Sequence, residues 1–227
     1  MIVQVPVGLR ILVFVAACVC VCACGGADEL PPSIFKDLND KVIVAVKAND
    51  VEAVKALLQN RAPVDARGSG DGADEGYTAL LYAIERRYLP LARLLLQSGA
   101  DPNLPGGHQN VFPLLTAAGA GERDLIALLL DYRANINQKR PDDGMDALAA
   151  ACLQGHLTIV DLLVARNAVV EPQDLGYAIG GGHTPVVERL LKAGAKPAWT
   201  FGGRTMTQIA RESPRATREE MLALLRQ

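Results

Sequence analysis

Apolar and polar residues alternate along most of the chain with the period of short amphipathic helices, which come in pairs. Leu91, Leu94 and Leu95 follow the i, i+3, i+4 spacing that places side chains on one face of a helix. The segment before them carries small residues at Ala79 and Ala83, which let two helices pack closely together. Neither helix of such a pair buries its apolar face alone, so the pattern predicts helix pairs that stack on one another.

One phrase recurs at the end of each second helix and in the loop that follows it. The alanine after the helix end recurs at steps of 38, 34, 34 and 27 residues. A second phrase, at the start of the first helix, recurs with a step of 34 residues, so two independent patterns share one period. The first phrase reads ALLQNRAPVDA at 56–66, LLLQSGADPNL at 94–104, LLLDYRANINQ at 128–138, LLVARNAVVEP at 162–172 and LLKAGAKPAWT at 190–200; the second reads TALLYA at 78–83, FPLLTA at 112–117 and DALAAA at 146–151.

This period resembles that of the ankyrin repeat, which is about 33 residues long. The second phrase stands where the family has T-P-L-H-x-A; only Phe112–Ala117 keeps the proline, and no repeat keeps the histidine. The resemblance covers roughly residues 36–225. It implies an all-α fold, an ankyrin-repeat solenoid of stacked helix pairs with short hairpin fingers, in a domain at 36–227 with about five to six repeats including caps.

Two connecting loops depart from the regular period. The loop RGSGDGADEG at 67–76 carries extra residues and predicts an exposed finger; it lacks the ligand order of an EF-hand, so no calcium site is expected. The fourth unit is short by seven residues between Val170 and Gly176, so one finger is expected to be missing or collapsed. Gly99 and Gly194 follow second helices, where a left-handed cap is expected.

The resemblance implies a concave binding surface formed by the fingers and the exposed side of each first helix. Tyr82 and Tyr177 occupy one repeat position and are expected to be exposed there. The last finger, KPAWTFGGR at 196–204, holds two aromatic residues that either anchor a partner or fold back over the last helix pair as a cap. The predicted surface comprises Tyr82, Glu85, Arg86, Thr116, Leu153, Gln154 and Tyr177, with Trp199 and Phe201 as further partner-binding candidates.

The rest of the sequence gives no candidate for catalysis. His156 and His183 match the family's turn between helices, where an imidazole normally hydrogen-bonds the turn. His108 has no Ser or Cys beside it, no G-x-S-x-G motif is present, and the glycines at 180–182 do not follow a strand. We therefore expect no catalytic residue, no metal site, no cofactor and no small-molecule substrate.

The stretch ACVCVCACGG at 17–26 holds four of the five cysteines. Residues 11–23 carry no charge and no proline, a length typical of the apolar part of an export signal; an uncleaved membrane anchor is the alternative. Alternating cysteines in an apolar run have neither the C-x-x-C spacing of zinc sites nor a polar disulfide framework. The stretch therefore indicates a segment removed on export.

The residues before Cys24 resemble the lipobox of bacterial lipoproteins, with Cys18 as the alternative lipidated residue. The resemblance implies a signal peptide at 1–23 and a tether at 24–35. Gly25 stands where an Asp would resemble an inner-membrane retention signal. We therefore expect a lipid anchor in the outer membrane facing the periplasm; secretion or anchoring in the inner membrane are the alternatives.

Composition and charge narrow the class of partner. A 227-residue chain with 50% hydrophobic and 21% charged residues has the composition of an ordinary globular protein. The net charge of -2 argues against a nucleic acid as the binding partner. The sequence predicts a non-catalytic, monomeric protein-binding module on the periplasmic side of a bacterial membrane. A narrower hypothesis is an immunity protein or inhibitor of a secreted effector; the alternative is a structural or protective accessory of an envelope enzyme.

Overall fold

The computed structural model describes residues 32–69 and 75–226. Contacts divide the chain into two units, Met1–Lys36 and Asp37–Gln227, and of the first unit only the start of one helix is described. The predicted signal peptide, both candidate lipidation sites at Cys24 and Cys18, and most of the tether lie outside the described residues. Within the described ranges, no helix has the length and hydropathy needed to cross a membrane.

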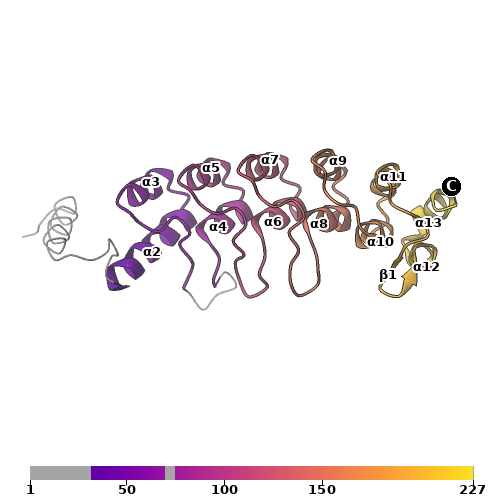
Figure 1. The fold of residues 1–227 in the computed structure, drawn as a ribbon, viewed down its shortest axis with the longest axis horizontal. Coiled ribbons are helices and arrows are strands. Elements are labelled where there is room, and N and C mark those ends of the chain that lie inside the picture. Colours follow the sequence, from indigo (N-terminus) through magenta and orange to yellow (C-terminus); the bar gives the residue numbers. More distant parts are fainter. Residues whose placement is uncertain (1–31, 70–74, 227) are drawn as a thin grey trace, which may run out of the picture. The chain divides into compact units, whose positions relative to one another are not determined.

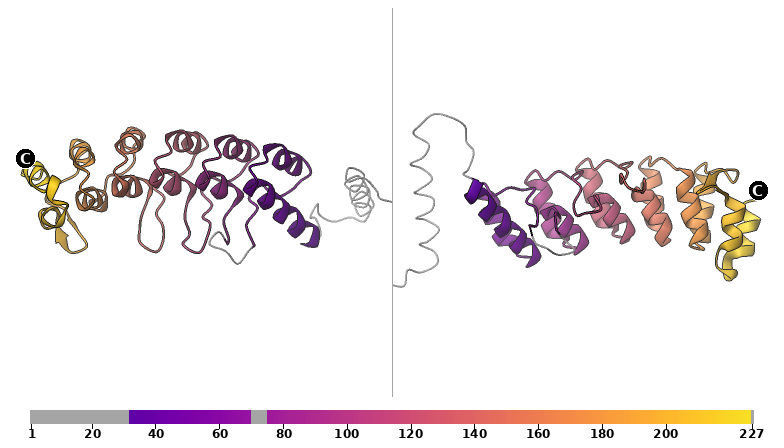
Figure 2. Two further views of the ribbon diagram at one scale, coloured as in Figure 1. Left: turned by 180° about the vertical axis from the view of Figure 1, so that it is seen from behind. Right: turned by 90° about the horizontal axis from the view of Figure 1, so that it is seen from below.

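Each repeat is a pair of helices, and the stacked pairs place the helices in two rows (Figures 1 and 2). The first helices of the pairs form one row and the second helices form the other, as expected for an ankyrin-repeat solenoid. The first helices are α2 (Pro32–Lys47), α4 (Ala79–Glu85), α6 (Pro113–Gly119), α8 (Ala147–Gln154), α10 (Pro172–Gly180) and α12 (Met206–Glu212); the second helices are α3 (Val51–Gln59), α5 (Leu89–Gln97), α7 (Arg123–Asp131), α9 (Leu157–Ala165), α11 (Thr184–Lys192) and α13 (Arg215–Leu224).

Local signals set the helix ends. The side chain of Thr78 accepts a hydrogen bond from Leu81 N at the start of α4, and the residues that follow second helices have a positive φ. Gly99 and Gly194 take this conformation as predicted, with φ of 95° and 101°. Non-glycine residues, Arg61 among them, fill the same role in other repeats.

A continuous core lies between the two rows of helices. The second helices α5, α7, α9 and α11 contribute a leucine at the same repeat position, and these four side chains, Leu95, Leu129, Leu163 and Leu190, are all fully buried. Burying one such side chain contributes roughly 1.5–3 kcal/mol. The core extends over the whole described part of the second unit, so packing between repeats is its main source of stability.

Side-chain hydrogen bonds join successive loops at the base of the fingers. Asp65 Oδ1 accepts from Asp101 N at 3.1 Å, and Asn103 Oδ1 accepts from Asn135 N at 2.7 Å. In the next repeat Asn137 Oδ1 accepts from a backbone N–H of the following loop at 2.9 Å. These bonds fix each finger relative to its neighbour.

One finger is absent, at the place where the sequence predicts a missing or collapsed finger. Residues 132–146 form a long finger between α7 and α8, whereas residues 166–171 lead directly from α9 to α10 (Figure 1). The last finger is a hairpin of β1 (Thr200–Phe201) and β2 (Arg204–Thr205), paired antiparallel with Phe201 opposite Arg204. The prediction of a collapsed fourth finger is therefore confirmed.

Candidate binding face

We call the exposed side of α4, α6, α8 and α10, together with the fingers, the finger face. Glu85 and Arg86 are exposed at the end of α4, and Leu153 and Gln154 are exposed at the equivalent end of α8. Leu153 is 37% exposed, so it presents apolar surface at the end of α8. The predicted exposure of these four residues is confirmed, and their predicted contact with a partner stays a prediction.

The predicted exposure of Tyr82 is wrong. Its side chain is only 2% exposed, because α4 lies between neighbouring repeats and the ring packs into the core. Tyr77 from the first finger meets the ring edge-on, with ring centroids 5.4 Å apart, and Lys47 Nζ lies 5.0 Å from the ring centroid. Tyr82 therefore supports the finger face from beneath and offers no surface to a partner.

The other tyrosine at this repeat position, Tyr177, is half-buried. Phe201 meets its ring edge-on, with centroids 5.0 Å apart and an interplanar angle of 66°. Phe201 also lies on Gly176: a Cβ atom there would be 2.5 Å from the Phe201 ring. Phe201 therefore folds back over α10 rather than over the last helix pair, and Trp199 of the same finger is half-buried against the core.

An ion pair lies in the finger next to Tyr177. Arg140 binds both carboxylate oxygens of Asp143, with Nε to Oδ1 at 2.9 Å, and the pair holds the pKa of Asp143 at about 2. Burial raises the pKa of Tyr177, and the charge of Asp143 adds to this rise.

Thr116 of α6 has the same repeat position as Tyr177. Its side chain is half-buried and donates a hydrogen bond to Phe112 O.

The two turn histidines have the structural role predicted for them. His156 Nε2 lies 3.1 Å from Gly119 O, and His183 Nε2 lies 3.0 Å from Leu153 O. Each imidazole thus contacts the end of the preceding first helix and joins two repeats. Across residues 32–69 and 75–226, no group of His, Cys, Asp and Glu side chains has an arrangement that could hold a metal ion.

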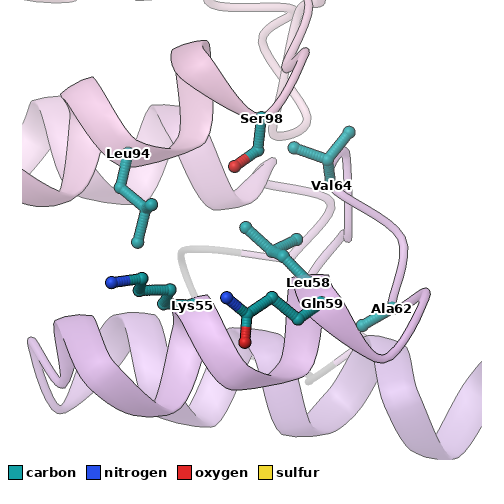
Figure 3. A pocket seen from close by; sticks show the side chains of 7 residues that line it. All are labelled: Lys55, Leu58, Gln59, Ala62, Val64, Leu94 and Ser98. Atoms are coloured by element: carbon teal, nitrogen blue, oxygen red, sulfur yellow. The ribbon is translucent and has the colours of Figure 1, made fainter.

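A shallow hollow of about 420 Å³ lies in the other row of helices, between α3 and α5 (Figure 3). Leu58, Val64 and Leu94 line it, and Lys55 stands at its rim. The hollow has a simple origin, because Ser98 occupies the repeat position that the bulky Tyr132 fills in the next repeat. It is open to solvent and carries no arrangement of side chains for catalysis.

Two buried carboxyl groups were not anticipated from the sequence. Asp146 is 2% exposed and Asp174 is fully buried, at the N-termini of α8 and α10. The residues Glu171-Pro172-Gln173-Asp174 form an acidic capping box at the start of α10, and this pattern is a sequence signal for a helix start that sequence reasoning missed. The burial of Asp174 depends on the neighbouring repeat, and no local sequence pattern indicates it.

Comparisons with known proteins agree with this architecture. A family model described as ankyrin repeats in three copies matches residues 36–106 and 105–174. A putative ankyrin repeat-containing protein of Treponema pallidum is 37% identical over 92 residues, which are 40% of this chain and 29% of that protein. The mitochondrial disaggregase of Bos taurus is 31% identical over 146 residues, 63% of this chain and 20% of that protein.

Among solved structures, the human ASB11 ankyrin repeat domain matches with a TM-score of 0.69 and 24% identity, covering 81% of each chain. This likeness shows the fold alone. The match spans less than a third of the length of either relative, so most of each relative has no counterpart in it.

Proposed function

Because the chain belongs to the ankyrin-repeat family, we propose that it is a non-catalytic module that binds another protein through the finger face. Ankyrin repeats are a protein-protein interaction module. Their stacked units present an extended, preformed surface, so a partner is bound with little loss of conformational entropy by the module.

One observation carries the proposal: equivalent surface positions at the ends of the first helices differ from repeat to repeat, while the buried leucine of α5, α7, α9 and α11 recurs. The ends of the first helices present Glu85–Arg86 on α4, Gly119–Ala120 on α6, Leu153–Gln154 on α8 and Gly180–Gly181 on α10. Packing does not require these differences, because the side chains of the two larger pairs are exposed. A charged end followed by a neutral strip with an exposed leucine suits a partner that is charged at one end and apolar beside it.

The binding test compares two exposed aliphatic residues. Leu153→Glu changes the finger face, and Val169→Glu changes a residue that is 53% exposed in the link between α9 and α10. In cross-linking capture by the full chain, followed by quantitative mass spectrometry, we expect at least a tenfold loss of the captured partner for Leu153→Glu. Val169→Glu should capture as the wild type does. Equal capture by both variants would exclude binding through this face.

We further propose that the finger face works on the periplasmic side of a bacterial membrane, held by a lipid on Cys24 or, failing that, Cys18. A lipid tether raises the local concentration of the module at the membrane where a partner would act. Labelled palmitate should be incorporated by the wild type and lost in Cys24→Ser. Labelling that survives in Cys24→Ser and is lost in Cys18→Ser would move the anchor to Cys18.

Inhibition of a secreted effector is the narrower form of the proposal, and protection of an envelope enzyme is its alternative. The activity and thermal inactivation of the captured partner distinguish these two roles. An inhibitor abolishes the activity of the partner on mixing, in proportion to complex formed. A protective accessory leaves that activity unchanged and slows the thermal inactivation of the partner.

A further inference from the structure

The helix that follows the collapsed finger starts early. In the repeats of α4, α6 and α8, the first helix begins nine residues before the N-cap of the second helix, whereas α10 begins eleven residues before His183. Asp174 thereby takes the repeat position of Ala79, Pro113 and Ala147, which are all buried. A carboxyl group occupies a position where the other repeats have a small apolar side chain.

The carboxyl group of Asp174 is only half-satisfied by hydrogen bonds. Its Oδ2 accepts a hydrogen bond from Glu171 N at 2.7 Å, which completes the capping box of α10. Its Oδ1 is buried and has no hydrogen-bond partner in the part of the chain that the structure describes. A buried carboxylate with one donor is costly, whereas a protonated carboxyl keeps the backbone bond and carries no charge.

The groups around Asp174 are mainly acidic. Asp146 lies at the N-terminus of α8, and its Oδ1 accepts a hydrogen bond from Ala149 N at 2.9 Å. Glu171 is on the same loop as Asp174, and the nearby cation, Lys139, is already paired with Glu171 at 2.5 Å. Cys152 of α8 is buried nearby, and burial raises the pKa of its thiol.

Within the described residues, no charged group on the other elements that pack against α10 donates to Asp174 Oδ1; on α11, Lys192 is exposed and Glu188 is half-buried. Arg189 of α11 pairs with Asp161 of α9, and Arg204 of β2 pairs with Glu212 of α12. Arg211 of α12 is exposed. Burial therefore dominates and raises the pKa of Asp174 to about 8; Asp146 and Glu171 add to the rise, and Glu171 N–H and Lys139 oppose it.

We propose that a proton on the buried carboxyl of Asp174 locks α10 against α8, and that loss of this proton loosens the C-terminal end of the finger face. Deprotonation would place a second buried negative charge beside Asp146, with no donor for Oδ1. Tyr177 lies on α10, and Phe201 of the last finger rests on it, so both would move with the helix. This regulation of partner binding rests on the proposed function, although the lock itself can be tested without a partner.

The direction of the pH effect follows from linkage. The pKa of Asp174 is higher in the folded chain than the value of about 3.9 for an unfolded Asp, so the folded state holds the proton more tightly. Its contribution to stability is complete below pH of about 4 and is lost as the pH rises towards 8. Over this window the unfolding equilibrium constant rises by up to about tenfold per pH unit.

The experiment compares the full chain with two Asp→Asn variants. Asp174→Asn keeps an oxygen that accepts from Glu171 N and removes the titration, and Asp142→Asn is the matched control on an exposed finger residue. Unfolding by denaturant is followed through Trp199, the chain's one tryptophan, at pH 5 and pH 8. We expect the unfolding constant of the wild type and of Asp142→Asn to rise at least tenfold more between these pH values than that of Asp174→Asn.

Parallel pH dependence of the wild type and Asp174→Asn would overturn the proposal. If Asp174→Asn does not fold, carbon NMR titration of the side-chain carboxyls in the wild type decides the question. A buried Asp carboxyl that titrates near pH 8 supports the lock, and full ionisation of every Asp carboxyl by pH 6 refutes it. Neither readout involves a partner, so failure of the binding module and failure of the lock remain distinguishable.

Discussion

Residues 132–146 and residues 166–171 both lead from a second helix to the next first helix, and the surroundings of Asp143 in the first segment are opposite to those of Asp174, just after the second. The longer segment forms a finger, in which Asp143 is partly exposed and bound by Arg140. The shorter one enters α10 directly and carries Asp174 into the core. The pKa of Asp143 is lowered to about 2, and that of Asp174 is raised to about 8.

The difference shows how much a finger does besides presenting side chains. The finger at 132–146 leads the chain away from the core, so Asp143 within it is partly exposed and paired with Arg140, although Asp146 at its end is buried as the N-cap of α8. Without a finger, α10 begins early, and its residue Asp174 takes a position between two repeats where the regular repeats have a small apolar side chain. The short link, through the early start of α10, thus places an acid where its ionisation weakens the fold at neutral pH.

The largest test of the comparison removes one leucine on each side of the collapsed finger. Leu129→Ala in α7 and Leu190→Ala in α11 delete fully buried side chains at one repeat position, and each should lower the free energy of unfolding by about 2–5 kcal/mol. Repeats stabilise each other mainly through nearest neighbours. Leu190→Ala should therefore lower the denaturation midpoint seen by Trp199 fluorescence more than the midpoint seen by circular dichroism.

Leu129→Ala should shift both midpoints together, because α7 lies in the regular part of the stack. Coincident transitions for Leu190→Ala as well would mean that the collapsed finger does not weaken the coupling between repeats.

A second test compares two glycines with nearly equal backbone conformation. Gly144 in the finger has φ of 71°, and a Cβ added there would meet no atom within 4 Å; at Gly155, with φ of 74°, an added Cβ would lie 2.4 Å from His183 Nδ1. Gly144→Ala should cost about 1 kcal/mol of stability, and Gly155→Ala about 2–4 kcal/mol, because strain and a clash add. Denaturant unfolding measures both, and equal losses would show that the His183 ring moves aside freely.

The smallest effect concerns Asp143, whose pH dependence should be opposite to that of Asp174. Its folded pKa is lowered, so its contribution to stability is present above pH of about 4 and is lost as the pH falls towards 2. The side chain is 38% exposed and screened by solvent, so Asp143→Asn should cost less than about 1 kcal/mol at pH 6. The unfolding free energy of Asp143→Asn should approach that of the wild type as the pH falls through 2; a difference as large at pH 2 as at pH 6 would assign the effect to packing.

The repeating phrases in the sequence predicted much of the architecture. They placed the helix pairs, the collapsed finger and the glycines that end second helices, because these features depend on spacing within one repeat. They also placed Glu85, Arg86, Leu153 and Gln154 on the surface, since the end of a first helix is exposed in each of those repeats.

The same counting failed for Tyr82, and it left two readings of the last finger open. Tyr82 and Tyr177 share a repeat position, but the first is covered by Tyr77 and the second by Phe201 to a different extent. Each of these covering residues comes from a finger, whose path is irregular. The repeat position determines the place on the helix from which a side chain projects, and the neighbouring finger determines whether that side chain is exposed to solvent.

The sequence by itself determined the stack: apolar spacing fixed the helices, and a constant period obliged them to pack on one another. The tertiary structure alone decided which polar groups lost water. Asp143 and Asp174 are both acids at the edge of a loop, and no local pattern separates a carboxylate with an arginine partner from a carboxyl pressed between α8 and α10. Desolvation depends on everything that surrounds a group, and that is known only when the repeats have been brought together.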